Sequence, residues 1–446
     1  MFKSAPPFKI SVMTQGKRRN TTLGAEAEIL AGFPFKSAEY VNDPAAPRLL
    51  RGDNVVQGSI RWDDAKHWPE SKLDGLTDYA LQPGDVVLAM DRPWIEAGLK
   101  YAAITAHDLP ALLVQRVARL RGKNGLDQRF LKYVIGSADF TDYILAVQTG
   151  TSVPHISGQQ IKDYKFECPP IAEQHAIARV LGALDDKIEL NRRMNRTLEQ
   201  MAAALFKSWF VDFDPVTAKA EGRRPFGMSA ETAALFPAAF QDSVLGPIPQ
   251  GWKTGIVGEE YNLTMGQSPP GNTYNELGEG TAFYQGRTDF GFRYPTPRVF
   301  CTAPTRLANA GDTLVSVRAP VGDVNMALEN CSIGRGVSAI RHKSGSRSFT
   351  YYAMRSLGDE FDVFEGEGTL FGSIGGSDFR GLKIIVPEPR VVAEFERRAH
   401  PFDQSIENNE RQVTTLASIR DALLPKLLSG EIRVKAAEKQ VERAIG

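Results

Sequence analysis

The chain has 446 residues, and its 53 Lys and Arg balance its 53 Asp and Glu, so the formal net charge is zero. That length suffices for two or three domains, and 42% hydrophobic residues are ordinary for a globular protein. Neither a membrane span nor an N-terminal signal sequence is evident, so we expect a cytoplasmic protein. Three scattered cysteines exclude a disulfide framework and a CxxC zinc site, and the balanced charge excludes a simple polycation that coats nucleic acid.

Residues 1–168 read as a first globular region. Turn residues flanked by apolar ones mark Gly32–Tyr40, and Pro47–Trp62 mixes β-forming and turn residues in a way that predicts a short hairpin. Leu81–Met90 is typical of a turn that enters a buried strand. Leu113–Lys123 holds three arginines close together, which either contact phosphate or lie on a solvated strand face. They are Arg116, Arg119 and Arg121.

A long amphipathic helix is predicted over residues 169–210. Pro170 suits a first helical turn, and Glu173 faces the positive end of the helix dipole. Apolar positions recur every three or four residues, which is the spacing of a coiled-coil seam, and a single helix of this length cannot bury such a seam alone. The seam residues are Ile177, Leu181, Leu184, Ile188, Asn191, Leu198 and Leu205.

Residues 211–252 follow as an ordered linker. The segment is rich in Pro, Gly and small residues, and it holds one short helical candidate near Ser229–Leu235. Four phenylalanines make it too apolar for a free tether. They are Phe213, Phe226, Phe236 and Phe240.

Residues 253–386 form a second globular region that echoes the first at drifting offsets, with Gly84-Asp85 aligning with Gly311-Asp312. A second long helix is predicted over 387–430, followed by a C-terminal tail over 431–446. This helix aligns with the first without a gap, and Asn191 falls on Asn409, where a polar residue fixes the register of two helices. We expect Pro401 to kink or interrupt it. Its seam residues are Ile406, Asn409, Val413, Leu416 and Leu423.

Four stretches carry a family resemblance: GFPFKSAEY, WFVDFDPVTAKAEGR, LFPAAFQDSVLGPIPQGW and RDALLPKLLSGEIRV. With the repeated helix, the chain resembles a DNA-specificity subunit of type I restriction–modification systems. The resemblance implies an α+β fold with two α/β target-recognition domains, each reading one half of an asymmetric bipartite DNA sequence. Two long antiparallel helices would form a coiled coil with a pseudo-two-fold repeat, set the spacing between half-sites and dock two methyltransferase subunits. Restriction and translocase subunits would join that core. S-adenosylmethionine, ATP and magnesium are expected on those partner subunits, and no cofactor is expected in this chain.

Base-edge contacts need Arg, Lys and small polar side chains on exposed loops, and two half-sites about one helical turn apart suit a chain with two reading regions. The first region offers Lys36, Ser37, Arg51, Asn54, Gln57 and Arg61 as DNA-binding candidates, and the second offers Gln267, Ser268, Asn272, Tyr274, Gln285, Arg287 and Arg318.

Away from its seam, the first helix offers Leu190, Met194, Met201 and Phe206 to partner helices.

Catalytic motifs are missing from the sequence. It has no GxxxxGK[ST] phosphate loop, no HExxH and no paired metal-ligand spacing of its six histidines. We therefore expect a chain that directs chemistry on its partners and is not itself an enzyme. Two alternatives stay open: a coiled-coil adaptor that does not read DNA, and the specificity part of a fused methyltransferase system.

Overall fold

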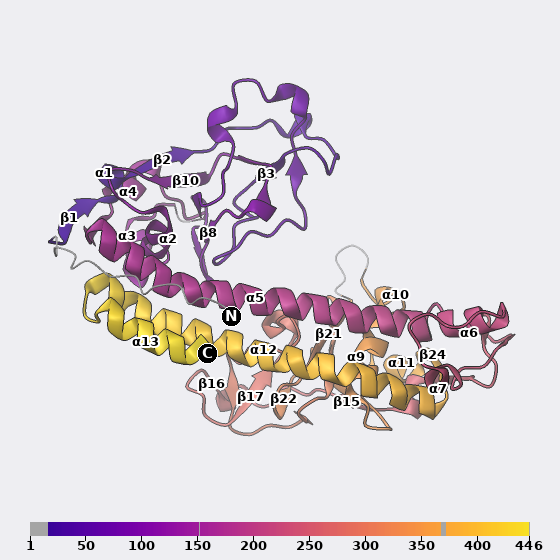
Figure 1. Ribbon diagram of the computed structural model, residues 1–446. Helices are drawn as coiled ribbons and strands as arrows, with labels where there is room; N and C mark the ends of the chain where they lie inside the picture. The colour runs from indigo at the N-terminus through magenta and orange to yellow at the C-terminus, as the bar shows by residue number, and fades with distance from the viewer. Residues whose placement is uncertain (1–16, 151, 367–371, 446) are drawn as a thin grey trace, which may run out of the picture. The chain divides into compact units, whose positions relative to one another are not determined.

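The computed structural model describes residues 17–150, 152–366 and 372–445. The fold is α+β, and the chain divides into two compact units, residues 1–189 with 413–446, and residues 190–412. The long helices α5 (Ile171–Phe210) and α12 (Pro389–Ser429) each give one half to either unit (Figure 1). We call the part of the first unit that precedes α5, residues 17–168, the first head, and residues 253–386 the second head.

The first head is built around a four-stranded antiparallel sheet. The central strands are largely buried, and helices after the last strand cover one face together with the first half of α5. Asp127 and Ser137 cap the two covering helices by accepting backbone N–H bonds from Phe130 and Phe140. The sheet order is β2 (Ala27–Ala31), β10 (Val117–Gly122), β5 (Val86–Ala89) and β8 (Tyr101–Ala103), and the helices are α2 (Gln128–Ile135) and α3 (Ala138–Val147).

The expected turn and buried strand over Leu81–Met90 are present, because β5 is buried throughout. The short hairpin predicted over Pro47–Trp62 is confirmed for residues 54–61. Val55 and Ile60 form an antiparallel bridge, the N–H of Val56 donates to the carbonyl of Ser59 at 3.1 Å, and the N–H of Arg61 donates to the carbonyl of Asn54 at 2.8 Å. The strand in this stretch pairs elsewhere, in a small sheet of β4 (Lys66–His67), β3 (Arg48–Leu50) and β9 (Ala111–Leu113).

Short elements close the first unit. Arg18 donates to Glu173 Oε1 at 2.6 Å and to the carbonyl of Leu427 at 3.1 Å, so it joins the starting strand to both long helices. The predicted C-terminal tail contains a helix that was not predicted from the sequence, and this helix buries Ala437 and Val441 in the core of the unit. These elements are β1 (Arg19–Thr22), α1 (Leu23–Glu26), β6 (Trp94–Ile95), β7 (Gly98–Leu99), α4 (Gly158–Asp163), β11 (Lys165–Cys168) and α13 (Val434–Ile445).

The second head repeats the first sheet with the same order and the same antiparallel pairing. Its strands are β15 (Tyr261–Met265), β23 (Val337–His342), β20 (Thr313–Val317) and β21 (Val321–Met326), covered by α9 (Arg347–Ser356) and α10 (Gly358–Asp362). A five-stranded sheet lies beyond it, in the order β16 (Tyr274–Asn275), β18 (Phe300–Cys301), β17 (Thr281–Tyr284), β22 (Cys331–Ile333) and β19 (Leu307–Ala308). The head begins and ends with β14 (Lys253–Ile256), α8 (Val257–Glu260), α11 (Gly376–Gly381) and β24 (Lys383–Val386).

The recurring Gly-Asp pair of the sequence has a structural explanation. Asp85 accepts the backbone N–H of Gln82 at 2.8 Å and forms an ion pair with Arg121 at 2.5 Å. In the second head Asp312 accepts the N–H of Asn309 at 2.6 Å and pairs with Arg341 at 2.6 Å. Each aspartate therefore closes a turn and pins the neighbouring strand.

Residues 211–252 are ordered, as expected, and belong to the second unit. The predicted helix near Ser229 is α7 (Ala230–Ala233), and α6 (Asp214–Ala220) was not foreseen. Phe213 and Phe236 are buried, whereas Phe226 is fully exposed and Phe240 is partly so. Two short strands complete the segment, β12 (Phe240–Gln241) and β13 (Ile248–Pro249).

The two long helices contact each other within both units. In the second unit Asn191 donates to Gln412 at 2.9 Å, and Asn409 donates to Asn195 at 2.8 Å, so the helices run in opposite directions there. In the first unit Arg420 reaches Asp185 at 3.1 Å. Asn191 and Asn409, which share a position in the repeat, therefore bond to other partners and not to each other. The remaining seam residues are buried or half-buried in the two cores.

Pro401 does not interrupt the second helix, contrary to the expectation. Helix α12 is continuous from Pro389 to Ser429. Proline leaves the carbonyl four residues earlier without an intrahelical donor. Both Pro401 and Arg397, which carries that carbonyl, are exposed, so water can satisfy it.

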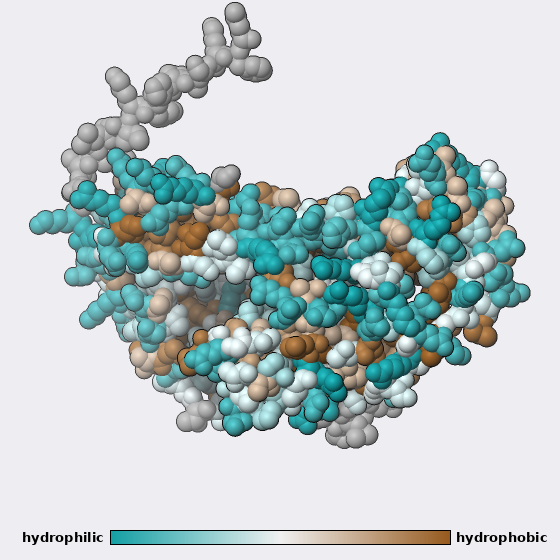
Figure 2. Space-filling view, turned by 90° about the horizontal axis from the view of Figure 1, so that it is seen from below, coloured by the Kyte–Doolittle hydropathy of each residue, from teal (hydrophilic) through white to brown (hydrophobic). Residues whose placement is uncertain are grey.

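No helix in the described ranges is long and apolar enough to cross a bilayer. On the face drawn in Figure 2, hydrophilic residues predominate and hydrophobic residues gather in several separate groups.

Candidate nucleic-acid interface

The arginines of the first head fall into two groups by exposure and ion-pair distance. Arg119 is buried and bonds to Glu28 at 2.8 Å, and Arg121 bonds to Asp85 at 2.5 Å. These two serve the sheet, so the interpretation of the Arg116–Arg121 cluster as a phosphate contact fails for both. Arg116 differs, because it is 61% exposed and lies 3.5 Å from Asp91.

Two of the predicted DNA-binding residues share the loose arrangement of Arg116. Arg51 lies 3.4 Å from Asp53, and Arg61 lies 3.8 Å from Asp63. Exposed pairs at such distances contribute little to stability. A phosphate could therefore take the place of the aspartate at little cost, whereas it could not displace the partners of Arg119 and Arg121.

The other predicted residues of the first head differ in how free their side chains are. Lys36 and Ser37 are exposed at the start of a short 3₁₀ turn. Asn54 is buried, accepts the N–H of Arg51 and donates to the carbonyl of Arg61, both at 3.0 Å. Gln57 is exposed and donates to the carbonyl of Gly98 at 3.2 Å. Asn54 thus shapes the loop that presents Arg51 and Arg61.

In the second head, three predicted residues meet at one pocket of about 400 Å³. Ser268 and Gln285 exchange hydrogen bonds at 2.9–3.0 Å, and Tyr274 stacks on Phe283 with ring centroids 4.7 Å apart while its hydroxyl donates to the carbonyl of Pro269 at 2.8 Å. Arg335 and the Arg298–Asp289 pair complete the polar lining. The pocket combines amide, hydroxyl, guanidinium and aromatic groups, which are the groups that contact bases and phosphates.

The four remaining predicted residues of the second head do not line this pocket. Gln267, Asn272 and Arg318 are exposed. Arg318 lies directly after β20, and its backbone bridges to Ser373. Arg287 forms an ion pair with Asp323.

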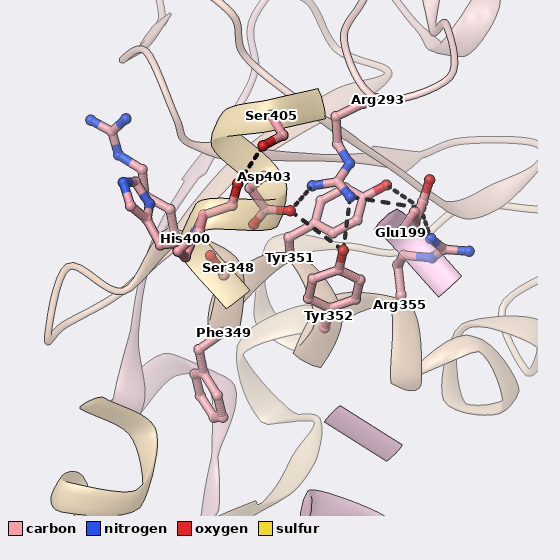
Figure 3. A network of polar contacts seen from close by, with 12 residues as sticks. Glu199, Arg293, Ser348, Phe349, Tyr351, Tyr352, Arg355, His400, Asp403 and Ser405 are labelled. Carbon is pink, nitrogen blue, oxygen red and sulfur yellow. Dashed lines mark hydrogen bonds and ion pairs between the residues drawn. The ribbon is translucent and has the colours of Figure 1, made fainter. Parts of the chain in front are cut away.

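A buried polar network joins the second head to both long helices within the second unit (Figure 3). Arg293 is fully buried, donates to Asp403 of α12 at 2.7 Å and to the hydroxyl of Tyr352 at 2.8 Å, and lies 4.0 Å over the ring of Tyr351. Glu199 of α5 accepts from Tyr351 at 3.2 Å and from Arg355. Burial by itself would lower the pKa of Arg293, but Tyr351, Asp403 and Tyr352 more than offset it and raise that pKa, so the guanidinium stays charged.

The first head meets the long helices through a related arrangement. Asp185 of α5 accepts from Tyr133 at 2.8 Å and from Lys132 at 2.6 Å, and Arg420 of α12 lies 3.1 Å from it. Burial alone would raise the pKa of Asp185, but Lys132, Tyr133 and Arg420 outweigh burial and lower it. Asp185 and Asp403 occupy the same position of the repeated helix, and each accepts from a tyrosine of the helix that covers its head.

Comparison with known proteins decides between the interpretations. The family model described as "Type I restriction modification DNA specificity domain" matches residues 52–200. A protein of Methanocaldococcus jannaschii assigned as the MjaX type I restriction enzyme specificity subunit is 28% identical, covering 90% of each chain. The HindI type I restriction enzyme specificity subunit of Haemophilus influenzae is 26% identical, over 81% of this chain and 89% of its own. Over most of its length the chain is therefore similar to specificity subunits of type I restriction enzymes.

A solved structure supports the fold of this chain. The crystal structure of the type I restriction–modification S subunit from M. genitalium matches 94% of this chain and 98% of its own, with a TM-score of 0.52 and 16% identity. The relatives are named as specificity subunits, in agreement with the resemblance noted in the sequence. No group of three or more metal-ligating side chains occurs within the described ranges.

Sequence reasoning missed two basic residues, Arg92 and Lys100, that the fold brings near Arg61. Arg92 is exposed with a φ of 43°, a left-handed conformation that is uncommon outside glycine, and Arg116 shares it with a φ of 69°. Lys100 is about nine-tenths buried, and burial, together with the charges of Arg92 and Arg61, lowers its pKa despite Asp53 and Asp91. An Arg-Pro step after a buried strand was the only signal in the sequence.

Proposed function

We propose that this specificity subunit binds double-stranded DNA and that each head reads one half of an asymmetric bipartite target. One observation carries the proposal: the two heads share a four-stranded sheet of identical order, yet the loops that leave the sheet differ between them. A shared framework with different loops suits two readings of two different sequences, whereas an adaptor without a DNA role would not need the loops to differ.

Candidate contacts in the first head are the exposed or loosely paired side chains, and those of the second head are the pocket residues and their exposed neighbours. The pairs Arg51–Asp53 and Arg61–Asp63 would open to phosphate, while Ser268, Gln285 and Arg335 would face base edges or backbone. Asn54 and Arg287 would act through the loops they hold. Lys36, Ser37, Gln57, Gln267, Asn272, Tyr274 and Arg318 complete the proposed set.

Within this proposal, α5 and α12 form an antiparallel coiled coil with a pseudo-two-fold repeat, which sets the number of base pairs between half-sites. Methyltransferase subunits dock on the exposed apolar residues of α5, which are Leu190, Met194 and Met201. Phe206 is not available for this purpose, because it is buried against Phe210, Phe349 and Phe395. Partner subunits bring S-adenosylmethionine, and restriction and translocase subunits bring ATP and magnesium.

Exchanging the heads tests the proposal. The chain is expressed with its methyltransferase subunit, and methylated bases are mapped across the genomic DNA of the host. We expect one bipartite motif, and replacing residues 17–150 with the first head of another family member should alter one half of the motif only. Methylation without a bipartite motif, or a change in both halves at once, would refute the division of labour.

A further inference from the structure

The two heads differ in the loop between two equivalent sheet strands. In the second head β20 and β21 are joined by Arg318, Ala319 and Pro320 alone. In the first head the corresponding strands β5 and β8 are separated by residues 90–100, which fold into the β6–β7 hairpin. The hairpin is thus an addition to the first head at a position where the second head has only a three-residue turn.

The base of the hairpin is firmly held. The N–H of Lys100 donates to the carbonyl of Pro93 at 2.7 Å, and the N–H of Met90 donates to that of Arg116 at 2.8 Å. The segment after α3 holds the other side, with Ile156 donating to Met90 at 2.9 Å. Gln57 joins from the neighbouring loop through its bond to Gly98 at 3.2 Å. A fixed base means that the tip is presented in a defined direction.

Strand β6 exposes apolar groups beside the exposed Glu96–Ala97 turn that forms the tip of the hairpin. Trp94 pairs with Leu99 and Ile95 with Gly98, and while Leu99 is buried, Trp94 is 39% exposed and Ile95 41% exposed. Tryptophan side chains are on average largely buried in folded proteins. A tryptophan next to an isoleucine on a two-stranded tip therefore points to a surface that meets a partner.

The charges around the tip indicate which partner. Arg92 precedes the tip, Arg116 lies at its base, and the charges of Arg92 and Arg61 act on Lys100, as do those of Asp53 and Asp91. The aspartates here hold their arginines at 3.5–3.8 Å and mostly in the open. Arginines that are only loosely paired with exposed aspartates can bind a polyanion, and exposed apolar side chains can contact the flat faces of bases. Duplex DNA offers both a chain of phosphates and stacked bases.

We propose that the β6–β7 hairpin inserts Trp94 at a base step of the half-site read by the first head, with Arg92 and Arg116 on the flanking phosphates. Architectural DNA-binding proteins insert apolar side chains flanked by arginine or lysine in this way. The free-energy cost of unstacking the base step is offset by the larger contact area between protein and bent DNA. The inference rests on the proposed function and adds to it an asymmetry: only the first half-site is deformed.

The test uses the full chain bound to its methyltransferase subunits and duplexes that carry the mapped target with 2-aminopurine at single positions. We expect the fluorescence to rise on binding at one step of the first half-site and at none of the second. Trp94→Ala should abolish the rise and weaken binding about ten-fold or more, in the range of base–aromatic stacking, and Trp94→Phe should restore most of both. Arg92→Ala should lower the slope of log K against log salt by about one.

Val244→Ala is the matched control, since Val244 is 77% exposed and lies within residues 211–252, which hold no predicted DNA contact; it should change neither signal. Normal affinity and an unchanged fluorescence rise with Trp94→Ala would overturn the hairpin while leaving the proposed function standing. Release of the methyltransferase subunit by Trp94→Ala would overturn it as well, by assigning the tip to a protein partner. If the wild-type complex methylates no bipartite sequence, the proposed function fails and the hairpin inference with it.

Discussion

At the scale of single residues, charge is concentrated where each head contacts the long helices. In each unit an aspartate of the repeated helix, Asp185 or Asp403, accepts from a tyrosine and a cation of the head. A buried charge is costly when left unpaired, and a buried pair need not be better than an apolar one. We therefore expect these contacts to fix the orientation of each head on the helix segments of its own unit more than to add stability.

Replacing Arg293 with methionine should lower the free energy of unfolding by about 3–5 kcal/mol, because Asp403 is then left buried and unpaired. Urea unfolding followed by circular dichroism measures the change. Arg287→Met is the matched control, because both side chains of the Arg287–Asp323 pair are about half exposed and its loss should cost less than about 1 kcal/mol. Adding Asp403→Leu to Arg293→Met should recover much of the loss, and a double variant no better than the single one would contradict the account.

The stabilising effect of Asp185 should depend on pH. Its pKa is lower in the folded chain, so its contribution is fully present above the ordinary pKa of about 3.9 and is lost as pH falls through the folded value. The free energy of unfolding should be lower in Asp185→Asn than in the wild type at pH 6, and the gap should narrow below about pH 4. Asp186→Asn serves as control, because Asp186 is exposed. A gap that stayed constant with pH would show that Asp185 acts through its shape and not its charge.

At the scale of elements, the long helices were the most predictable part of the chain. Residues 169–210 and 387–430 were predicted helical, and the structure has Ile171–Phe210 and Pro389–Ser429. Apolar residues that recur every three or four positions over about eleven turns predict a helix strongly, because many residues share the same period. The pairing of short strands such as β3 with β9 was not predicted, because the partner lies far along the chain and two or three residues are too few to show a period.

Pro401 offers a test of how helix α12 tolerates a proline. Pro401→Ala should stabilise the second unit by about 1–2 kcal/mol, because it restores a donor for the Arg397 carbonyl and removes a steric conflict, less the entropy that the unfolded chain regains. Thermal unfolding with Ser405→Ala as a nearby exposed control measures the gain. A loss of stability would mean that the pyrrolidine ring makes contacts that the helix needs.

The exposed apolar face of α5 is expected to bind methyltransferase. Leu190, Met194 and Met201 are 43%, 43% and 49% exposed. Met194→Asp with Met201→Asp should leave the heads folded and weaken co-purification of the methyltransferase subunit at least ten-fold, because a carboxylate would be buried without a partner. Gln200→Asp is the matched control beside the face. Unchanged stoichiometry in the double variant would place the docking surface elsewhere.

At the scale of the whole molecule, the family and the α+β class could be predicted from the sequence, and the details of the interface could not. Motifs that span the chain identify relatives regardless of loop structure. Whether an arginine serves the sheet, like Arg119, or stands free, like Arg61, depends on a carboxylate from a distant strand. Arg92 was missed for the same reason, since its neighbours Lys100 and Arg61 come together only in the fold.

The spacing between half-sites is the property that belongs to the whole molecule. If the long helices set it, lengthening both should change the spacer and nothing else. Because Asn409 bonds to Asn195 and the helices run in opposite directions there, the insertions must be matched, with four residues after Asn195 and four after Asn408. Four residues add about 6 Å of helix, which corresponds to one or two base pairs at about 3.4 Å each.

Methylome mapping of this variant should show both half-site sequences unchanged and the spacer one or two base pairs longer. A matched insertion of two residues is the control: it turns each stripe by about 200° and should abolish assembly, since apolar seam residues would face water. An insertion in α5 alone should also fail, because Asn191 and Asn195 would lose their partners on α12. If the four-residue variant stays active and methylates only the original spacing, the helices do not set the spacer, and its length must be fixed by the partner subunits.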